Sequence, residues 1–349
     1  MTCPTAVALP TTQVSDPHDA PALRWGIVAP GGIADHFVRC LHGATASRAV
    51  AVVSRAQERA EAFAAEHGID RAYDSLTAMI ADGEIDAVYV ASPHAQHHEL
   101  ARPVLEAGVP TLVEKAFTLN TAQAQDLIGV ARDRGVLLME AMWTRFLPQT
   151  DVLRQVVEQG LLGELVLVRA DHGQFFPHDP HHRLFAPELG DGALLDLGVY
   201  PVSFAQMLLG DLTDLQVAGD LTDQGVDATA AILARGRDGA RAVLDTTLRA
   251  RTATLAEVVG TEATARLSSP FYAPGTLTVT WHDGGEAAVE HPGNRDLCLA
   301  YEAAEFARCL QAGRTESPLM PWDDTLSVLR TLDAVRAEIG VVYPGEASA

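Results

Sequence analysis

The sequence has few positive charges and no long hydrophobic run, and each absence excludes a class of function. It contains 25 Lys and Arg residues against 46 Asp and Glu residues, which gives a formal net charge of −21. Because phosphate contacts supply most of the affinity of nucleic-acid-binding proteins, this balance argues against nucleic acid as a partner. No apolar run approaches the roughly 20 residues that a membrane-spanning helix needs. We therefore expect a soluble protein with neither a nucleic-acid nor a membrane partner.

Cysteine is also scarce, and no secretion signal is recognisable. The chain has four cysteines, with neither CxxC spacing nor the density of a disulfide scaffold, so we expect reduced, mostly buried thiols. The first segment is rich in Pro, Thr, Asp and Ala, and it lacks the basic start and apolar centre of a signal peptide. We interpret residues 1–22 as a flexible leader and predict a cytoplasmic protein.

From Arg24 onward, short apolar runs alternate with amphipathic stretches as far as about residue 145. Alternation at this spacing implies right-handed crossovers and a doubly wound parallel sheet. The predicted strands are 25–29, 49–53, 87–91, 111–113 and 136–139, and the predicted helices are 33–41, 55–67, 96–107 and 121–134.

The pattern then changes, so a length of 349 residues is best divided into two domains. After a helix near 148–159, a strand at 165–170 and a helix-like stretch at 193–209, alternating strands run from 215 to 289. This one-faced alternation suits a mostly antiparallel, open sheet with one covered side. We predict an α/β chain with a parallel-sheet domain over 23–145 and an α+β domain over 146–349, which ends in helices at 297–312 and 325–339.

The turn after the first strand has the form of a degraded GxGxxG motif. Residues 29–34 read APGGIA, with Ala29 at the first glycine position. Gly31 would let the backbone approach a pyrophosphate, which would then lie on the N-terminus of the next helix. An ordinary strand-to-helix turn is the alternative. The position of the motif between the first strand and the first helix favours a dinucleotide site, which includes Ala29, Gly31, Gly32 and Ile33.

The end of the second strand discriminates between NAD and NADP. An NAD site usually places Asp or Glu there for the ribose hydroxyl, whereas an NADP site offers a cation to the 2′-phosphate. Here Ser54 and Arg55 end the strand and Arg59 follows one helical turn later, with no carboxylate at the strand end. Hydroxyl and guanidinium groups can donate to a phosphate, so we predict NADP, although Arg55 as a solvated helix-start residue is the alternative.

Several further segments, in this order and spacing, resemble the Gfo/Idh/MocA oxidoreductase family from Arg24 to about Pro344. The chain is most similar to the family's subgroup of NADP-dependent dihydrodiol and D-xylose dehydrogenases. The resemblance implies a Rossmann fold for the first domain and a substrate-binding and oligomerisation role for the second. The segments are SPHAQH at 92–97, EKA at 114–116, MEAMWTRF at 139–146, GALLDLGVY at 192–200, ESP at 316–318 and the stretch 339–344.

The resemblance implies that Lys115 is the lysine of the family's Glu-Lys-Pro motif. Ala116 replaces the proline, but the amine is retained. Lys115 follows a predicted strand at the carboxyl edge of the parallel sheet, where ligands bind in such folds. An ammonium there can hydrogen-bond a substrate oxygen and lower the pKa of a neighbouring phenol.

A second family element places Asp196 and Tyr200 four residues apart, so that a helix would present both on one face. Pro201 implies either a first helical turn or a kinked helix. A phenol with a pKa of about 10 is a poor base at neutral pH. We expect Lys115 to lower the pKa of Tyr200. Tyr200 would donate the proton in reduction and accept one in oxidation, while Asp196 would orient the substrate or Tyr200.

The remaining candidates come from loops that the resemblance assigns to the cleft. We expect Ser92, His94, His97, Glu114, Lys115, Trp143 and Arg145 to contact the cofactor, and Trp143, His181, His182 and Arg183 to contact substrate, with a core position for Trp143 as the alternative. Histidines and aspartates between 171 and 182 match no zinc spacing, and hydride transfer needs no metal, so we predict none.

These features together predict an enzyme that moves a hydride between NADP and a sugar or diol, with its direction left open. A non-catalytic NADP-binding sensor on the same fold is the alternative, because fold does not fix function. Retention of Lys115, Asp196 and Tyr200 argues against a sensor. In the family the open sheet face pairs with another subunit, so we expect a homodimer or larger homo-oligomer.

Overall fold

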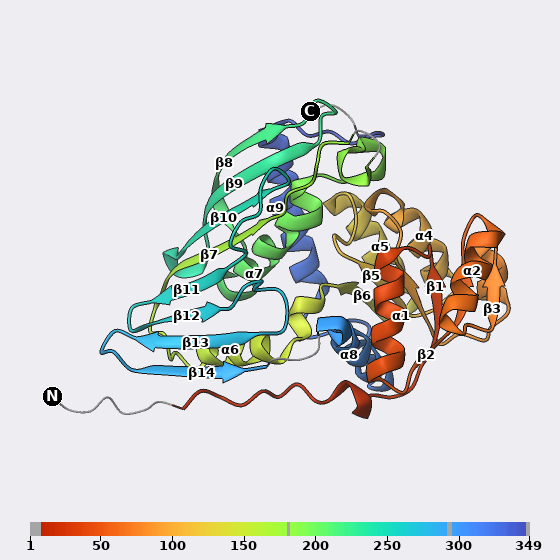
Figure 1. Cartoon of the computed structure of the whole chain (residues 1–349), viewed down its shortest axis with the longest axis horizontal. Coiled ribbons are helices and arrows are strands. Elements are labelled where there is room, and N and C mark those ends of the chain that lie inside the picture. The colour runs from red at the N-terminus through yellow and green to blue at the C-terminus, as the bar shows by residue number, and fades with distance from the viewer. Residues whose placement is uncertain (1–7, 180–181, 292–294, 347–349) are drawn as a thin grey trace. The chain divides into compact units, whose positions relative to one another are not determined.

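A computed structural model describes residues 8–179, 182–291 and 295–346, and the chain divides into two compact units (Figure 1). The parallel-sheet unit comprises Ser15–Phe146 and Asn294–Leu326. The mixed-sheet unit comprises Met1–Val14, Leu147–Gly293 and Ser327–Ala349. The expected division near residue 145 coincides with one of these limits, but segment 294–326 lies with the parallel sheet.

The parallel-sheet unit contains a six-stranded sheet of order β3-β2-β1-β4-β5-β6, in which all neighbours are parallel. This confirms the predicted doubly wound architecture. Strand β3 and helix α3 had no signal in the sequence, because both are short and β3 is half-buried along its length. The strands are β1 Arg24–Val28, β2 Arg48–Val53, β3 Arg71–Tyr73, β4 Ala87–Val90, β5 Thr111–Glu114 and β6 Leu138–Ala141, and the helices are α1 Gly32–Ala44, α2 Gln57–His67, α3 Leu76–Ala81, α4 His94–Glu106 and α5 Thr121–Arg134.

Helix α8 (Ala300–Gln311) belongs to this unit because its apolar side is buried there. Its Phe306 packs against Trp25 of β1, with ring centroids 5.0 Å apart. Ala304 and Ala307 form a small cluster with Ala20 of the leader. Burial of these side chains is the physical reason why the unit extends beyond residue 146.

The described part of the leader is bound to the protein rather than projecting from it. In the mixed-sheet unit, the Thr12 hydroxyl and the Gln13 backbone N–H both donate to the Asp151 carboxylate, at 3.1 and 2.7 Å. In the parallel-sheet unit, Ala20 is buried against α8. Residues 1–7 lie outside the described part.

The mixed-sheet unit is built on an eight-stranded sheet of order β14-β13-β12-β11-β7-β10-β9-β8. All neighbours are antiparallel except β7 and β10, which are parallel, so the predicted mostly antiparallel sheet is confirmed. The strands are β7 Leu165–Gly173, β8 Thr213–Leu221, β9 Asp227–Arg235, β10 Arg241–Thr247, β11 Ala256–Gly260, β12 Ala263–Leu267, β13 Thr276–Trp281 and β14 Glu286–Glu290, with helices α6 Pro148–Glu158 and α7 Val199–Leu209 and most of α9 Trp322–Ile339.

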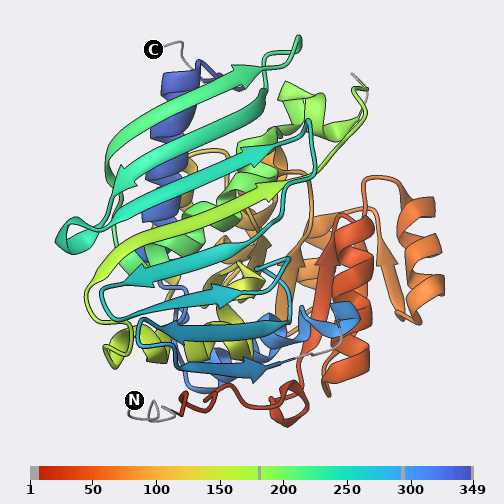
Figure 2. The ribbon, with the colours of Figure 1, turned by 60° about the vertical axis from the view of Figure 1, so that its left-hand side comes forward.

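The two faces of this sheet differ in exposure. Ala242 and Leu244 of β10 are buried, whereas Val243 between them is 42% exposed. Val243 lies opposite Leu233 of β9, which is 38% exposed. Figure 2 shows the strands in front with helices behind them. The alternation predicted from the sequence therefore corresponds to one covered face and one open face.

One described stretch, Pro187–Leu209, is long and apolar enough in composition to cross a membrane. However, 89% of its apolar window is buried inside the structure. Burial of this kind is typical of a core segment of a folded unit.

Candidate active site

The glycine-rich turn joins β1 to α1 with its backbone open on one side. Gly31 is extended and precedes the first helical residue, and the Ala29 N–H donates to the Val53 carbonyl at 3.1 Å. A Cβ added at Gly31 would meet no atom closer than 4.0 Å, and one at Gly32 would meet none within that distance. With Ile33 also 37% exposed, the first amides of α1 are accessible, which fits the pyrophosphate of a dinucleotide.

Ala29 occupies the first glycine position with a φ of +64°. This is the left-handed region, where an L-residue with a Cβ costs about 1–2 kcal/mol and glycine costs little. The degraded motif therefore keeps the backbone shape of the motif at a local energetic cost.

Two arginines follow β2, and one of them contacts this turn. Ser54 is buried at the strand end, while Arg55 and Arg59 are exposed. One Nη of Arg59 donates to the Pro30 carbonyl at 3.0 Å, which draws its side chain to the glycine-rich turn. An exposed guanidinium group next to this turn suits a phosphate ligand.

His97, expected among the cofactor contacts, is held by backbone carbonyls of its own unit. Its side chain is fully buried, and its ring nitrogens lie 3.0 Å from the Ala116 carbonyl and 2.8 Å from the Ser92 carbonyl. Burial lowers the pKa of His97 to about 4, so the ring is neutral at neutral pH. His94 is also buried, with its Nε2 3.2 Å from the Lys115 carbonyl.

Glu114 precedes Lys115, and its buried carboxylate is bound by two neighbouring groups. Its carboxylate accepts a hydrogen bond from the Tyr89 hydroxyl, and its other oxygen accepts the Lys115 backbone N–H at 3.2 Å. Burial raises the pKa of Glu114, and the Lys115 charge opposes that rise. The peptide bond between Lys115 and Ala116 is cis. Lys115 itself is half-buried, at the carboxyl end of β5 as predicted.

Trp143 and Arg145 lie in a short helical turn after β6, Trp143–Phe146, and both are buried. The Arg145 guanidinium is ion-paired with Asp324 at 2.8 Å, with 3% of its side chain exposed. Arg145 thus has a structural role in its unit, and its expected cofactor contact stays a prediction. Burial of Trp143 agrees with the core position that the sequence had left open.

In the mixed-sheet unit, Asp196 and Tyr200 lie on one continuous helical segment. Leu194–Gly198 forms a π-helical turn, and α7 follows directly from Val199. Pro201 is the third residue of α7 and lies inside this continuous segment, directly after the π-helical turn. Turns of π geometry inside helices often occur at functional sites.

Arg183 bridges the carboxylate of Asp196 in this segment and that of Asp191, which precedes it. Its Nη atoms lie 2.9 Å from Asp191 and 3.1 Å from Asp196, and its pKa is raised by both charges against the effect of burial. Arg183, predicted to contact substrate, therefore holds Asp196. Asp191 is fully buried.

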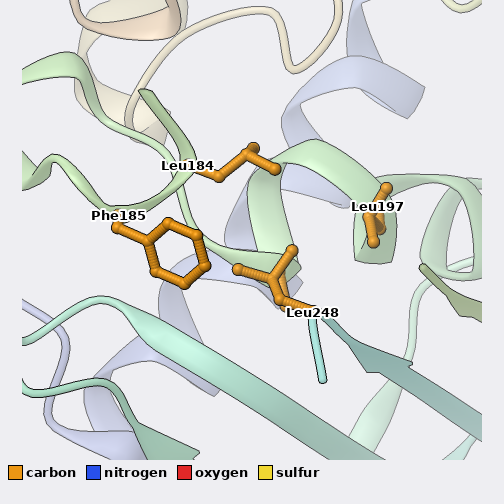
Figure 3. Close-up of a cluster of buried hydrophobic side chains, with 5 residues drawn as sticks. Leu184, Phe185, Leu197 and Leu248 are labelled. Atoms are coloured by element: carbon orange, nitrogen blue, oxygen red, sulfur yellow. The ribbon is translucent and has the colours of Figure 1, made fainter. Parts of the chain in front are cut away.

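The loop that carries Arg183 is anchored by an apolar cluster. Leu184 and Phe185 pack with Leu197 and Leu248, and Figure 3 shows these four side chains together. The Leu184 N–H donates to His182 Nδ1 at 3.3 Å, so that histidine caps the short helical turn. His181, the other predicted substrate contact of this loop, lies outside the described residues.

Tyr200 lies in an aromatic cluster that the sequence did not reveal. Its ring is 5.3 Å from that of His172 and 4.9 Å from that of Tyr272, stacked on the latter, and its residue is 8% exposed. Tyr272 comes from the connection between β12 and β13, and no local motif marks it. His172, noted only as a weak zinc candidate, lies near the end of β7. Such rings can pack against a flat substrate.

Two family models match the chain. Residues 23–142 match the model of an oxidoreductase family with an NAD-binding Rossmann fold, and residues 151–266 match the GFO/IDH/MocA C-terminal domain. The chain belongs to the Gfo/Idh/MocA oxidoreductase family. It is an oxidoreductase with a dinucleotide-binding domain, as the sequence predicted.

Curated relatives cover nearly the whole chain. Trans-1,2-dihydrobenzene-1,2-diol dehydrogenase of Macaca fascicularis is 35% identical over 331 residues, which is 93% of this chain and 98% of the relative. The same enzyme of Homo sapiens is 33% identical over 334 residues, with the same coverage.

Among solved structures, a 3-ketoreductase from Actinomadura kijaniata with NADP and TDP-benzene has a TM-score of 0.79 at 27% identity, covering 90% of this chain and 97% of its own. An aldose-aldose oxidoreductase from Caulobacter crescentus with glycerol has a TM-score of 0.81 at 22% identity, covering 92% and 98%, which supports the fold alone.

Proposed function

We propose that this protein is an NADP-dependent dehydrogenase or reductase that transfers a hydride between the nicotinamide and a sugar or trans-diol carbon. The diol dehydrogenases that align with almost the whole chain support this substrate class. The observation that carries the proposal is the constellation around Tyr200: a mostly buried phenol stacked on a second aromatic ring, one helical turn from an ion-paired carboxylate.

The residues supply orientation and proton transfer, and the bound nicotinamide supplies hydride chemistry. Tyr200 donates its hydroxyl proton to the substrate oxygen in reduction, and its anion accepts the hydroxyl proton in oxidation. Lys115 hydrogen-bonds the same substrate oxygen and favours the Tyr200 anion. Asp196, fixed by Arg183, orients the substrate hydroxyl next to the reacting carbon.

Turnover by point variants tests the enzyme against the sensor alternative. Lys115→Met and Tyr200→Phe are expected to lower kcat by about 100-fold or more, which is the range of a lost proton-transfer group, with NADPH affinity retained. Purified protein is assayed with NADP and a panel of aldoses and trans-diols. Absence of turnover in the wild type with every substrate would favour the sensor.

The choice of NADP over NAD rests on Ser54, Arg55 and Arg59. Titration with NADPH and NADH, followed by fluorescence, is expected to show at least about tenfold tighter binding of NADPH, or about 1.4 kcal/mol. Arg55→Ala is expected to reduce this preference and to leave NADH affinity unchanged. Tighter binding of NADH to the wild type would contradict the assignment.

The open face of the eight-stranded sheet, with Val243 opposite Leu233, supports a homodimer or larger homo-oligomer. Apolar side chains on an open face are commonly buried by a partner. A dimer mass in light scattering is the expected result, and a monomer at micromolar concentration would contradict it. Residence in the cytoplasm belongs to the same proposal.

A further inference from the structure

A buried acid lies at the start of the helical segment that carries Asp196 and Tyr200. Asp227, the first residue of β9, is fully buried. Its Oδ2 accepts the backbone N–H of Leu194 at 2.5 Å, at the residue where the helical turns begin. The carboxylate therefore contacts the N-terminus of the helical segment directly.

The chain before this helix is shaped to let the carboxylate approach. Gly192 has a φ of +134°, and a Cβ added there would lie 2.3 Å from Oδ1 of Asp227. Glycine is thus required both for the backbone conformation and for the close approach. Among the described residues, Oδ1 has no hydrogen-bond partner. One carboxylate oxygen binds the helix, and the other is buried.

The helix start is also held by β10. The Thr246 hydroxyl lies 3.2 Å from the Ala193 carbonyl and 2.9 Å from the His172 carbonyl. His172 in turn packs its ring against Tyr200. A shift of the helix start would therefore move Asp196 and disturb the packing around Tyr200.

Burying the charged carboxylate of Asp227 lowers the stability of the fold. Burial raises the pKa of Asp227 to about 6, so the buried group is ionised at neutral pH. Arg336 of α9 is the cation that acts on it, but that guanidinium is bound by Asp333 and Glu346. Tyr343, which donates to the Asp191 carbonyl, and Asp191 itself are the other titratable groups facing this region. A neutral amide of the same shape would avoid the cost of the charge.

We propose that Asp227 is a positioning residue whose negative charge fixes the start of the helix at Gly192–Leu194, and thereby sets Asp196 and Tyr200 against the substrate. An anion at a helix N-terminus interacts favourably with the helix dipole and with its unpaired amides. The inference rests on the proposed roles of Asp196 and Tyr200. The charge is retained at the expense of stability because the geometry of the catalytic helix depends on it.

Asp227→Asn tests the proposal, since the amide keeps the shape and one acceptor oxygen while removing the charge. We expect kcat/KM to fall by about 10- to 100-fold, the range for a small misplacement of catalytic groups, with NADPH affinity within about twofold of wild type. The thermal midpoint at pH 8 is expected to stay the same or rise, because a buried charge has been removed. Asp151→Asn is the matched control: Asp151 is also buried and accepts a backbone N–H in the same unit, but it binds the leader. It is expected to retain kcat/KM.

The pH profile separates a charge effect from a structural one. In the wild type, kcat/KM is expected to fall on the acid side with a midpoint near the Asp227 pKa of about 6. Because folding raises this pKa, the contribution of Asp227 to stability rises as pH falls through the same window, so activity and this contribution move in opposite directions. Asp227→Asn is expected to lack that acid limb.

Three results would overturn the proposal. They are a wild-type profile that is flat between pH 5 and 7, an Asn variant with wild-type kcat/KM, and an Asn variant that loses thermal stability and activity together. The wild-type profile needs no variant and so stays informative if Asp227→Asn does not fold. If Tyr200→Phe retains full turnover, the proposed function fails on its own, whatever Asp227→Asn does.

Discussion

The two units hold polar groups in opposite ways. The turn between β1 and α1 leaves backbone amides and guanidinium groups accessible, with open space above Gly31 and Gly32. Around Asp196 and Tyr200, by contrast, carboxylates are ion-paired, rings are stacked and glycines are in close contact with neighbouring groups. Accessible amides and guanidinium groups suit the binding of a charged ligand. A crowded one holds catalytic groups within the small tolerance that chemistry requires.

The largest expected effect is a loss of stability on substitution of Gly192, which is crowded, compared with Gly31 in the other unit, which is open. Gly192→Ala combines a left-handed backbone with a Cβ at 2.3 Å from Asp227, and strain plus overpacking should destabilise the protein by about 3 kcal/mol or more. Gly31→Ala, with extended backbone and open space, is expected to leave the thermal midpoint unchanged and to weaken NADPH binding. Equal losses of stability in both variants would contradict the contrast.

The next effect is a pH dependence of stability in the parallel-sheet unit. Burial raises the pKa of Glu140 from 4.5 to about 7, although Thr325 donates to it at 2.9 Å. The folded state therefore binds more protons between these values, and the contribution of Glu140 to the free energy of unfolding falls by about 3 kcal/mol as pH rises through them.

Glu140→Gln should remove that dependence. The variant is expected to be more stable than wild type at pH 8 and nearly equal at pH 4.5, measured by denaturant unfolding. A constant difference at both pH values would show that the Glu140 charge is not responsible.

A smaller effect is expected from the arginine that bridges Asp191 and Asp196. Arg183→Met should lower kcat/KM by about tenfold, or about 1.4 kcal/mol, because Asp196 loses the group that orients it. Arg183→Lys should recover only part of this loss, since one ammonium does not reproduce a fork over two carboxylates.

Arg24→Met provides the matched control in the other unit. Arg24 also bridges two carboxylates, Glu84 and Asp86, at 3.0 and 2.9 Å on an exposed surface. It is expected to change neither kcat/KM nor cofactor affinity. A similar loss of activity in both variants would argue against a specific role of Arg183.

The smallest effect is a gain in stability. Ala29→Gly removes the cost of a left-handed alanine, partly offset by the extra freedom of glycine in the unfolded chain, and should stabilise the protein by about 0.5 kcal/mol. Denaturant midpoints measure the difference, and NADPH binding is expected to be retained. A loss of stability would show that Ala29 packs favourably in a way that outweighs its conformation.

The sequence predicted well what depends on local pattern. The strand and helix alternation, the glycine-rich turn, Lys115 at a strand end and Asp196 with Tyr200 on a helix all follow from short-range spacing. The three-residue β3 carried no period long enough to detect. The place of segment 294–326 depended on which unit buries Phe306, and that is a property of the tertiary fold.

Side-chain roles were harder to predict than side-chain positions. His97 and Arg145 were expected to contact the cofactor, and no feature of the sequence indicated that their side chains also bind backbone carbonyls and Asp324. Tyr272, from the β12–β13 connection, and Asp227, from β9, contact the helical segment that carries Asp196 and Tyr200. Neither spacing nor residue type signals such pairings, because they exist only after the sheet has formed.

The parallel pairing of β7 with β10 has a consequence for synthesis of the chain. Strand β7 is the first of its sheet to leave the ribosome, yet it lies inside the sheet between β10 and β11. Both partners are translated much later, so both edges of β7 stay unpaired in the nascent chain until then. Such non-local pairing slows folding and leaves a strand open to association with other nascent chains. Overproduction at low temperature or with a holdase chaperone should therefore raise the soluble yield.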